Sequence, residues 1–358
     1  MANEKSRKQK KYGLKVFISS WPNYKSGGIL RDYKMIRSSF LDDETFEVQE
    51  ESISNQYLQN RLFRKVISLL ALFGLRANLR SKDYELIFLP QVGQLFRHTR
   101  TTLYVIRVHD VFPVTNPEWF ELLPRWNFRR ALIVSVRYKK VLYLCNSKTT
   151  QKNLLNAFPD KSLKTLVYPC QVSVMNEKNC SECSACVTRE VLPNKFLLMV
   201  GTIEPRKDYA FILNVIKKLG DRSLPIIVVG RVGWKSKETI RDLKHSNKVI
   251  WYKDACDGSL IHLYQAAVAF ISTSLDEGFN LPAAEAHQFG TPLLLRNIEI
   301  HQEFHSEHAK FFSNELELAN LIIAPSTYPR KNNPLRSGHQ DKFPKRELLN
   351  ILNHMRVD

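Results

Sequence analysis

Two glutamates in the C-terminal half of the chain have a spacing and a setting that suit a binding site. Glu277 follows a predicted strand at 267–273, and Glu285 lies eight residues later in a helix that we expect to begin near Pro282. The backbone N–H groups of residues 278–281 are then free at the positive end of that helix, where an anionic or hydroxyl-rich ligand binds well. The alternative is an ordinary strand–turn–helix unit with two solvated glutamates.

Two adjacent basic residues follow another predicted strand. Arg206 and Lys207 come shortly after the apolar run 196–201, which ends in a glycine. Arginine offers a planar fork and lysine a compact charge, so the pair suits a diphosphate group. A solvated basic turn is the alternative.

A histidine and a pair of glycines follow strands of the N-terminal half. His109 comes directly after the predicted strand 102–108, at the sheet edge where open α/β sheets bind ligands. Its neutral ring could accept a proton or bond a sugar hydroxyl, with Asp110 orienting it, although a structural histidine is also possible. Gly27 and Gly28 let the backbone approach a ligand closely before a helix. The G-x-G-x-x-G pattern of nicotinamide-binding sites is absent there.

Strands and helices alternate along both halves of the chain, which predicts an α/β protein with two doubly wound, parallel-sheet (Rossmann-like) domains facing each other across a cleft. We expect a disordered basic tail at 1–12, an N-terminal domain at 13–192, a C-terminal domain at 193–335, and a helix within 336–358 that packs back on the N-terminal domain. Further strands are expected at 15–20, 46–53, 84–89, 141–146, 166–169, 225–230, 249–252 and 292–295, and helices at 117–138, 209–219, 259–266 and 343–355.

The positive charge of the chain is concentrated in its N-terminal half. Residues 1–190 hold 31 Lys and Arg against 17 Asp and Glu, a net charge of +14, whereas residues 191–358 have a net charge of +4. This asymmetry predicts that the first half meets something anionic: nucleic acid, a membrane surface or a phosphorylated acceptor. A basic, apolar helix at 60–80 could lie in a membrane interface or pack on the sheet.

The first residues, 1–12, are basic and polar and do not resemble a signal peptide. The most apolar window, 66–75, is too short to cross a bilayer. We therefore expect a cytoplasmic protein, at most peripheral on the inner face of the membrane. Three cysteines, Cys180, Cys183 and Cys186, form a C-x2-C-x2-C run without the second half of a metal-binding signature. An interdomain loop with incidental thiols is favoured over a metal site.

Several motifs in the expected order give the chain a resemblance to the retaining glycosyltransferases of family 4, which adopt the GT-B fold. Glu277 and Glu285 match the family's E-x7-E motif. The likeness continues in the runs 200–208, 230–234 and 257–267, and more thinly in Gly27-Gly28 and 109–113. It covers most of residues 13–325. Asn280 stands where the family usually has glycine, which predicts a reshaped sugar pocket.

The resemblance implies roles for the catalytic residues. Glu277 would face the hydroxyls of the donor sugar, and His109 would lie near the reacting sugar. Arg206 and Lys207 would hold the diphosphate and stabilise the leaving nucleotide, so that no cofactor and no metal is expected. The remaining donor-binding residues would be Gly27, Gly28, Gly278, Phe279, Asn280, Leu281 and, at the nucleotide ribose, Glu285.

We predict from this a retaining hexosyltransferase that moves a hexose from a nucleotide diphosphate sugar to a glycan or lipid-linked acceptor hydroxyl in surface polysaccharide or lipopolysaccharide synthesis. The motif variants look most like those of mannosyltransferases, so GDP-mannose is the first donor to test. The alternatives are a transferase that uses a UDP sugar, a GT-B epimerase or phosphorylase, a basic nucleic-acid-binding protein, or an inactive scaffold. Nucleic acid is not expected as a partner, because the basic residues lack regular aromatic interleaving.

Overall fold

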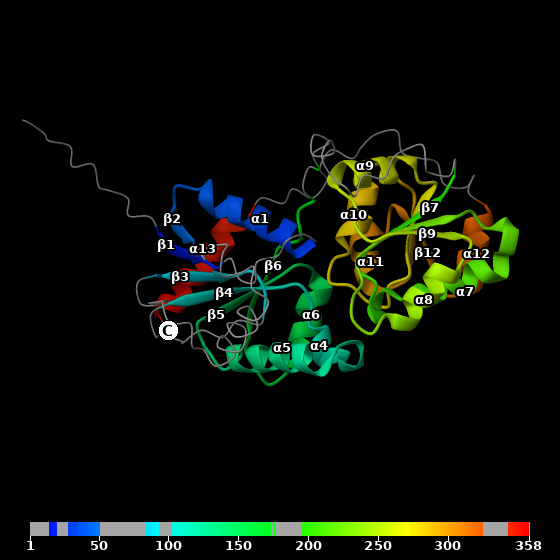
Figure 1. Ribbon diagram of the computed structural model, residues 1–358. Helices are drawn as coiled ribbons and strands as arrows, with labels where there is room; N and C mark the ends of the chain where they lie inside the picture. The colour runs from blue at the N-terminus through cyan, green and yellow to red at the C-terminus, as the bar shows by residue number, and fades with distance from the viewer. Residues whose placement is uncertain are drawn as a thin grey trace, which may run out of the picture.

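The computed structural model describes residues 14–19, 28–50, 84–92, 102–172, 175, 195–324 and 343–357. They form two parallel six-stranded sheets, each with its own helices, in two domains that lie side by side (Figure 1). This confirms the predicted α/β architecture with two Rossmann-like domains. The basic tail, the helix expected at 60–80, Gly27, the Cys180–Cys186 run and the domain boundary at 192 lie outside the described residues.

The N-terminal sheet has the strand order β2-β1-β3-β4-β5-β6. Alternate residues of its strands enter two separate apolar clusters, one on each face, so the central strands are continuous apolar runs. The strands are β1 (Leu14–Ile18), β2 (Phe46–Glu50), β3 (Leu86–Leu89), β4 (Leu103–Val108), β5 (Val141–Cys145) and β6 (Lys164–Val167).

Helices cover both faces of this sheet. On one face, α1 (Gly28–Leu41) and α13 (Lys345–Val357) contribute Ile36 and Leu348 to the apolar cluster, so the last helix of the chain packs on the N-terminal domain. On the other face lie α5 and α6, through residues such as Leu132 and Leu154. The remaining bounds are α4 (Phe112–Thr115), the 3-10 helix η2 (Pro117–Trp119), α5 (Leu122–Ser135) and α6 (Lys148–Ala157).

The C-terminal sheet has the order β12-β11-β10-β7-β8-β9 and is also covered on both faces. Its strands are β7 (Leu197–Val200), β8 (Ile226–Val229), β9 (Val249–Tyr252), β10 (Ala269–Ser272), β11 (Leu293–Arg296) and β12 (Ala309–Phe312). Its helices are α7 (Tyr209–Leu219), α8 (Lys237–His245), α9 (Asp257–Ala266), α10 (Leu281–Gln288), α11 (Glu299–His305) and α12 (Glu315–Ile323), with 3-10 helices η5 (Pro205–Lys207) and η6 (Gly220–Arg222).

The prediction of a single helix over 117–138 is wrong for residues 117–121. Helix α5 begins only at Leu122, and the backbone of Phe120 and Glu121 is extended. The reason is a tertiary contact with the other domain, because the ring of Phe120 stacks on Trp234 and the indole N–H of Trp234 donates to the carbonyl of Trp119 at 2.6 Å. Among the described residues, no helix is long and apolar enough to cross a bilayer.

A buried ion pair fixes helix α1 on the N-terminal sheet. Arg107 on β4 is fully buried, and its guanidinium donates two hydrogen bonds of 2.8 Å to the carboxylate of Asp32 on α1. A third bond of 2.6 Å goes to the carbonyl of Tyr168. Burial opposes the charge of Asp32, but Arg107 outweighs it and lowers the pKa of the carboxyl. The pair therefore sets the position of α1, which also carries Arg31.

We predict that Arg107→Met lowers the free energy of unfolding by about 3–5 kcal/mol, because it leaves the carboxylate of Asp32 buried without its cation. Urea unfolding measures this. The matched control is Arg37→Met on the same α1, since Arg37 pairs with Glu50 at the surface and its loss should cost no more than about 1 kcal/mol. Equal losses in the two variants would contradict the role given to Arg107.

Candidate active site

The candidate site lies at the point of the C-terminal sheet where the strand order reverses. Strand β7 has β8 on one side and β10 on the other, so the loops that follow β7 and β10 lead to α7 and α10 on opposite faces of the sheet. Open α/β sheets bind ligands in a crevice at such a point, beyond the carboxyl ends of the strands. Arg206 and Lys207 follow β7, and Glu277 follows β10. The topology therefore brings together residues that lie seventy positions apart in the sequence.

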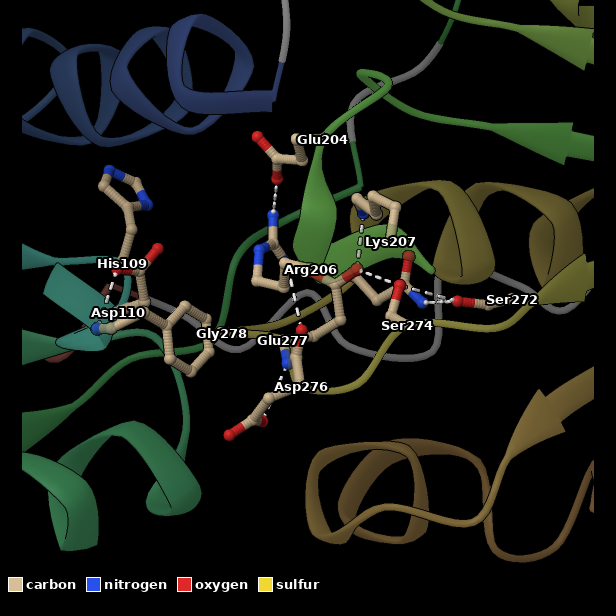
Figure 2. Close-up of polar contacts among 12 residues, drawn as sticks. His109, Asp110, Glu204, Arg206, Lys207, Ser272, Ser274, Asp276, Glu277 and Gly278 are labelled. Atoms are coloured by element: carbon tan, nitrogen blue, oxygen red, sulfur yellow. Dashed lines mark hydrogen bonds and ion pairs between the residues drawn. The ribbon is translucent and has the colours of Figure 1, made fainter. Parts of the chain in front are cut away.

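Glu277 lies between two cations in this crevice. Arg206 forms an ion pair with one of its carboxylate oxygens and Lys207 with the other, and the hydroxyl of Ser274 donates to the carboxylate at 2.7 Å. Arg206 also pairs with Glu204 at 2.6 Å (Figure 2). Two cations and two carboxylates thus form one buried, charge-balanced cluster.

The pKa of Glu277 shows that pairing outweighs burial. The side chain is almost completely buried, and burial alone would raise its pKa. The charges of Arg206 and Lys207, with the bond from Ser274, instead lower the pKa to about 2. Glu277 is therefore a fixed anion at any physiological pH.

Hydrogen bonds join the two loops that carry these charges. The N–H of Leu275 donates to the carbonyl of Arg206 at 2.8 Å, and the hydroxyl of Thr273 donates to the carbonyl of Lys207 at 2.8 Å. Arg296 at the end of β11 bonds both the carboxylate of Asp208 and the carbonyl of Thr273. The cations and the carboxylate are therefore held by their backbones as well as by each other.

Glu285 lies on α10 and already has two partners. Its carboxylate accepts a hydrogen bond of 2.9 Å from the hydroxyl of Tyr264 on α9 and forms an ion pair with Arg31 of α1. Arg31 also bonds Asp257 on α9 at 2.8 Å. Arg31 belongs to the N-terminal domain, so this cluster joins the two domains across the crevice.

The side chain of Asn280 points into the C-terminal domain, and its effect on the sugar pocket stays a prediction. The amide donates to the hydroxyl of Ser272 at 3.0 Å and contacts Nε2 of His301 at 2.8 Å. Its backbone is left-handed, with a φ of 66°, a conformation that favours glycine and tolerates asparagine. Burial lowers the pKa of His301 to about 4, so this ring is neutral and Nε2 can accept the amide hydrogen.

Gly278 lies at a close approach of the two domains. A Cβ atom on this residue would lie 1.8 Å from the carbonyl oxygen of His109 and 3.0 Å from Nδ2 of Asn146, both in the N-terminal domain. Gly28 has a similar relation to Leu281, whose Cδ1 would lie 2.8 Å from a Cβ at residue 28. A side chain at either position would collide with the other domain, which explains why Gly28 and Gly278 are glycines. Phe279 packs instead against Phe304 in its own domain.

His109 and Asp110 lie opposite the charged cluster. Nε2 of His109 is 3.1 Å from the carbonyl of Pro90, which can only accept, so Nε2 carries the hydrogen. Burial lowers the pKa of His109, which keeps the ring neutral. Burial raises the pKa of Asp110 to about 6, although the nearby charge of Arg206 works against this shift. Among the described residues no hydrogen bond joins Asp110 to His109. The carboxylate of Asp110 accepts one from the N–H of Phe112 instead.

Two further contacts between the domains were not expected from the sequence. The carboxylate of Glu303 on α11 accepts hydrogen bonds from the N–H groups of Lys148 and Thr149, at the start of α6, at 2.8 and 2.9 Å. On the other side of the crevice, Trp234 bonds and stacks on the segment 119–120. Both join residues more than a hundred positions apart, and no local sequence pattern predicts such pairs.

One described cluster has the spacing of metal ligands. Asp32, His109 and Cys170 have ligand atoms within 4.8 Å of one another. However, both oxygens of Asp32 accept from Arg107, whose Nη2 also lies 3.5 Å from the sulfur of Cys170. The guanidinium supplies the positive charge at this position, so the cluster is explained without a metal.

Comparison with known proteins supports a glycosyltransferase class. Residues 187–322, which include the whole charged cluster, match the family model of group 1 glycosyl transferases. The chain is 28% identical over 300 residues to the serotype-specific mannosyltransferase WbdA of Escherichia coli. The alignment covers 76% of this chain and 36% of WbdA. It is also 28% identical over 239 residues to the O-antigen chain mannosyltransferase RfbU of Salmonella typhimurium. That alignment covers 64% of this chain and 63% of RfbU. The chain thus spans about a third of the length of WbdA.

Solved structures show the same fold. Sucrose-phosphate synthase from Thermosynechococcus elongatus superposes with a TM-score of 0.63 at 15% identity, over 96% of each chain. A UDP-forming trehalose-phosphate synthase from Burkholderia xenovorans gives a TM-score of 0.59 at 12% identity, over 96% of this chain and 97% of that one. The fold is therefore GT-B, and the sequence is similar to those of mannosyltransferases. Membership of family 4 stays a prediction.

We predict that Gly278→Ala separates the domains at this contact, because the new methyl group cannot fit beside the carbonyl of His109. Small-angle X-ray scattering should show a larger radius of gyration. The control is Gly220→Ala, whose Cβ meets no atom within 4 Å. Its φ of 57° makes that variant less stable by about 1 kcal/mol but leaves the domain contact unchanged. An unchanged radius for Gly278→Ala would show that this contact does not hold the domains.

Proposed function

We propose that the protein is a retaining glycosyltransferase that moves a hexose, in the first instance mannose from GDP-mannose, to a hydroxyl of a glycan or lipid-linked acceptor in surface polysaccharide synthesis. The observation that carries the proposal is the buried cluster of Arg206, Lys207 and Glu277 at the strand ends of the C-terminal domain, facing the N-terminal domain. The match of this region to group 1 glycosyl transferases supports it.

Binding of the donor requires an exchange of partners in this cluster. Arg206 and Lys207 are now balanced by Glu277 and Glu204, so the site has no spare positive charge. A diphosphate would compete for the two cations, and the fork of Arg206 can bind two of its oxygens at once. Glu277 would then lose part of its pairing and accept hydrogen bonds from the hydroxyls of the sugar.

The ribose of the nucleotide would bind at Glu285. Both oxygens of this carboxylate are in use, one by Tyr264 and one by Arg31. Ribose hydroxyls that approach Glu285 would therefore displace Arg31, which can remain with Asp257. Donor binding would therefore break the ion pair between Arg31 and Glu285, which joins the two domains, and replace it with hydrogen bonds between Glu285 and the ribose.

The transfer step needs a stabilised leaving group. The bond between the anomeric carbon and the phosphate oxygen breaks, the acceptor oxygen bonds to that carbon, and the acceptor proton passes to the departing phosphate. Arg206 and Lys207 would neutralise the charge that develops on the leaving nucleotide, which is the role that a metal plays in other transferases. Metal independence is part of the proposal. The neutral ring of His109 would face the sugar from the other domain.

The mannose donor and the glycan acceptor come from the relatives. Both WbdA and RfbU are mannosyltransferases, and the latter acts on the O-antigen chain. A UDP sugar remains the alternative donor, and an epimerase or phosphorylase the alternative activity. We also propose that the protein is cytoplasmic and lies on the inner face of the membrane. The net charge of +14 in residues 1–190 supports this location.

We predict that the purified protein transfers label from a nucleotide sugar to a glycan acceptor, and that Glu277→Gln lowers the rate at least about a hundredfold. The neutral amide keeps the shape of Glu277 but gives the sugar hydroxyls and the cations a weaker acceptor. The control is Glu315→Gln, a surface residue of α12 paired with Lys218. Mass spectrometry of the acceptor measures transfer for GDP, UDP and ADP sugars. Near-normal transfer by Glu277→Gln, or isomerised donor without transfer, would refute the proposal.

A further inference from the structure

Helix α5 has an exposed apolar surface that the active site does not use. Its buried side, through Ala131, Leu132 and Ser135, packs on the N-terminal sheet. At its start, Leu122 is 76% exposed, Leu123 75% and Trp126 52%. Large apolar side chains at this level of exposure cost free energy in water, about 25 cal/mol per Å² of apolar area. Their grouping on one helix start is therefore unusual for a surface that meets only solvent.

The same helix and the turn after it are strongly basic. Residues 122–140 contain no Asp or Glu. The basic residues of this stretch are Arg125, Arg129, Arg130, Arg137, Lys139 and Lys140.

Apolar and basic side chains share one side of α5. Residues 122, 126, 129 and 133 follow each other at intervals of three or four, which places Leu122, Trp126, Arg129 and Ile133 on one face. The guanidinium of Arg130 lies 5.2 Å from the centre of the Trp126 ring. Leu122 and Trp126 thus share one surface of α5 with arginines, and these are residue types that helices in a membrane interface use.

Helix α12 also carries exposed apolar side chains, but its neighbouring charges are negative, whereas those of α5 are positive. Leu316 is 71% exposed and Ile323 44% exposed on α12 of the C-terminal domain. Glu315 and Glu317 flank Leu316 in the first turn of that helix. Exposure of apolar residues alone therefore does not distinguish α5. The combination with an acid-free basic stretch does, and it is complementary to an anionic surface.

We propose that this α5 surface, made by Leu122, Leu123 and Trp126 with the neighbouring arginines, docks the protein on an anionic lipid bilayer. The apolar side chains insert at the level of the headgroups, and the guanidinium groups pair with lipid phosphates. Each basic side chain near such a surface contributes about 1 kcal/mol of attraction. Nothing in this contact crosses the bilayer.

The position of α5 connects this surface to the crevice between the domains. Helix α5 begins two residues after Phe120, which stacks on Trp234 of the other domain, and Lys235 bonds the carbonyl of Glu118 at 2.5 Å (Figure 1). A bilayer at the start of α5 therefore lies next to the edge of the crevice. The docking surface itself is independent of the proposed activity. Its use to present a lipid-linked acceptor rests on that activity.

Flotation of the full chain with vesicles tests the proposal. The protein should bind vesicles of phosphatidylcholine with phosphatidylglycerol, and only weakly those of phosphatidylcholine alone. Leu122→Ser, Leu123→Ser and Trp126→Ser together should weaken binding at least about tenfold. Leu316→Ser is the matched apolar control. Arg125→Glu with Arg129→Glu should weaken binding to a similar extent, and Lys217→Glu on the exposed side of α7 is the charge control.

Three results would overturn the assignment: no binding of the wild-type chain to the anionic vesicles, full binding by the triple serine variant, or an equal loss in Leu316→Ser. Binding of a DNA oligomer that depends on the same three side chains, without vesicle binding, would assign the surface to a nucleic acid instead. The vesicles contain no acceptor, and the triple variant should still transfer sugar to a water-soluble acceptor. Failure of docking and failure of the proposed activity are thus measured separately.

Discussion

The candidate site depends on one carboxylate that is buried between two cations. A lone anion at the position of Glu277 would be costly, because few polar groups can replace the water that it loses. Arg206 and Lys207 remove that cost, and Glu204 balances the remaining positive charge. Because the two loops also bond each other through their backbones, the charges have fixed positions before any ligand arrives. Such preorganisation is what stabilisation of a leaving group requires.

The same cluster links the chemistry to the arrangement of the domains. Gly278 follows Glu277 directly and contacts the backbone of His109, and Arg31 reaches from α1 to Glu285. The position of α1 depends in turn on the buried pair of Arg107 and Asp32. A donor that takes Arg206 from Glu277 and Arg31 from Glu285 would therefore act on the contacts between the domains as well as on the site. Donor binding and domain position would then be coupled through shared partners.

Much of this arrangement could be predicted from the sequence because it follows from strand ends. Arg206, Lys207 and Glu277 each lie in the loop that follows an apolar strand, and parallel strands end at one edge of a sheet. The partners of Glu285 could not be predicted, because Arg31 lies 254 positions away and only the packing of the two domains brings it close. The direction of the Asn280 side chain was missed for a similar reason, since it depends on His301. Helices α8 and α11 were not predicted, because their short segments carry few apolar residues. Helix α12 and strand β12 were also not predicted, although they are mostly apolar, because short apolar runs do not by themselves distinguish a helix from a strand.

The central claim is that Arg206 and Lys207 exchange Glu277 for the diphosphate of a nucleotide sugar. A crystal structure of the full chain with GDP tests it most directly. Phosphate oxygens should lie within hydrogen-bond distance of both Arg206 and Lys207, the ribose should lie on Glu285, and Arg31 should pair with Asp257 alone. A nucleotide bound elsewhere, with the ion pairs of Glu277 and Glu285 unchanged, would contradict it.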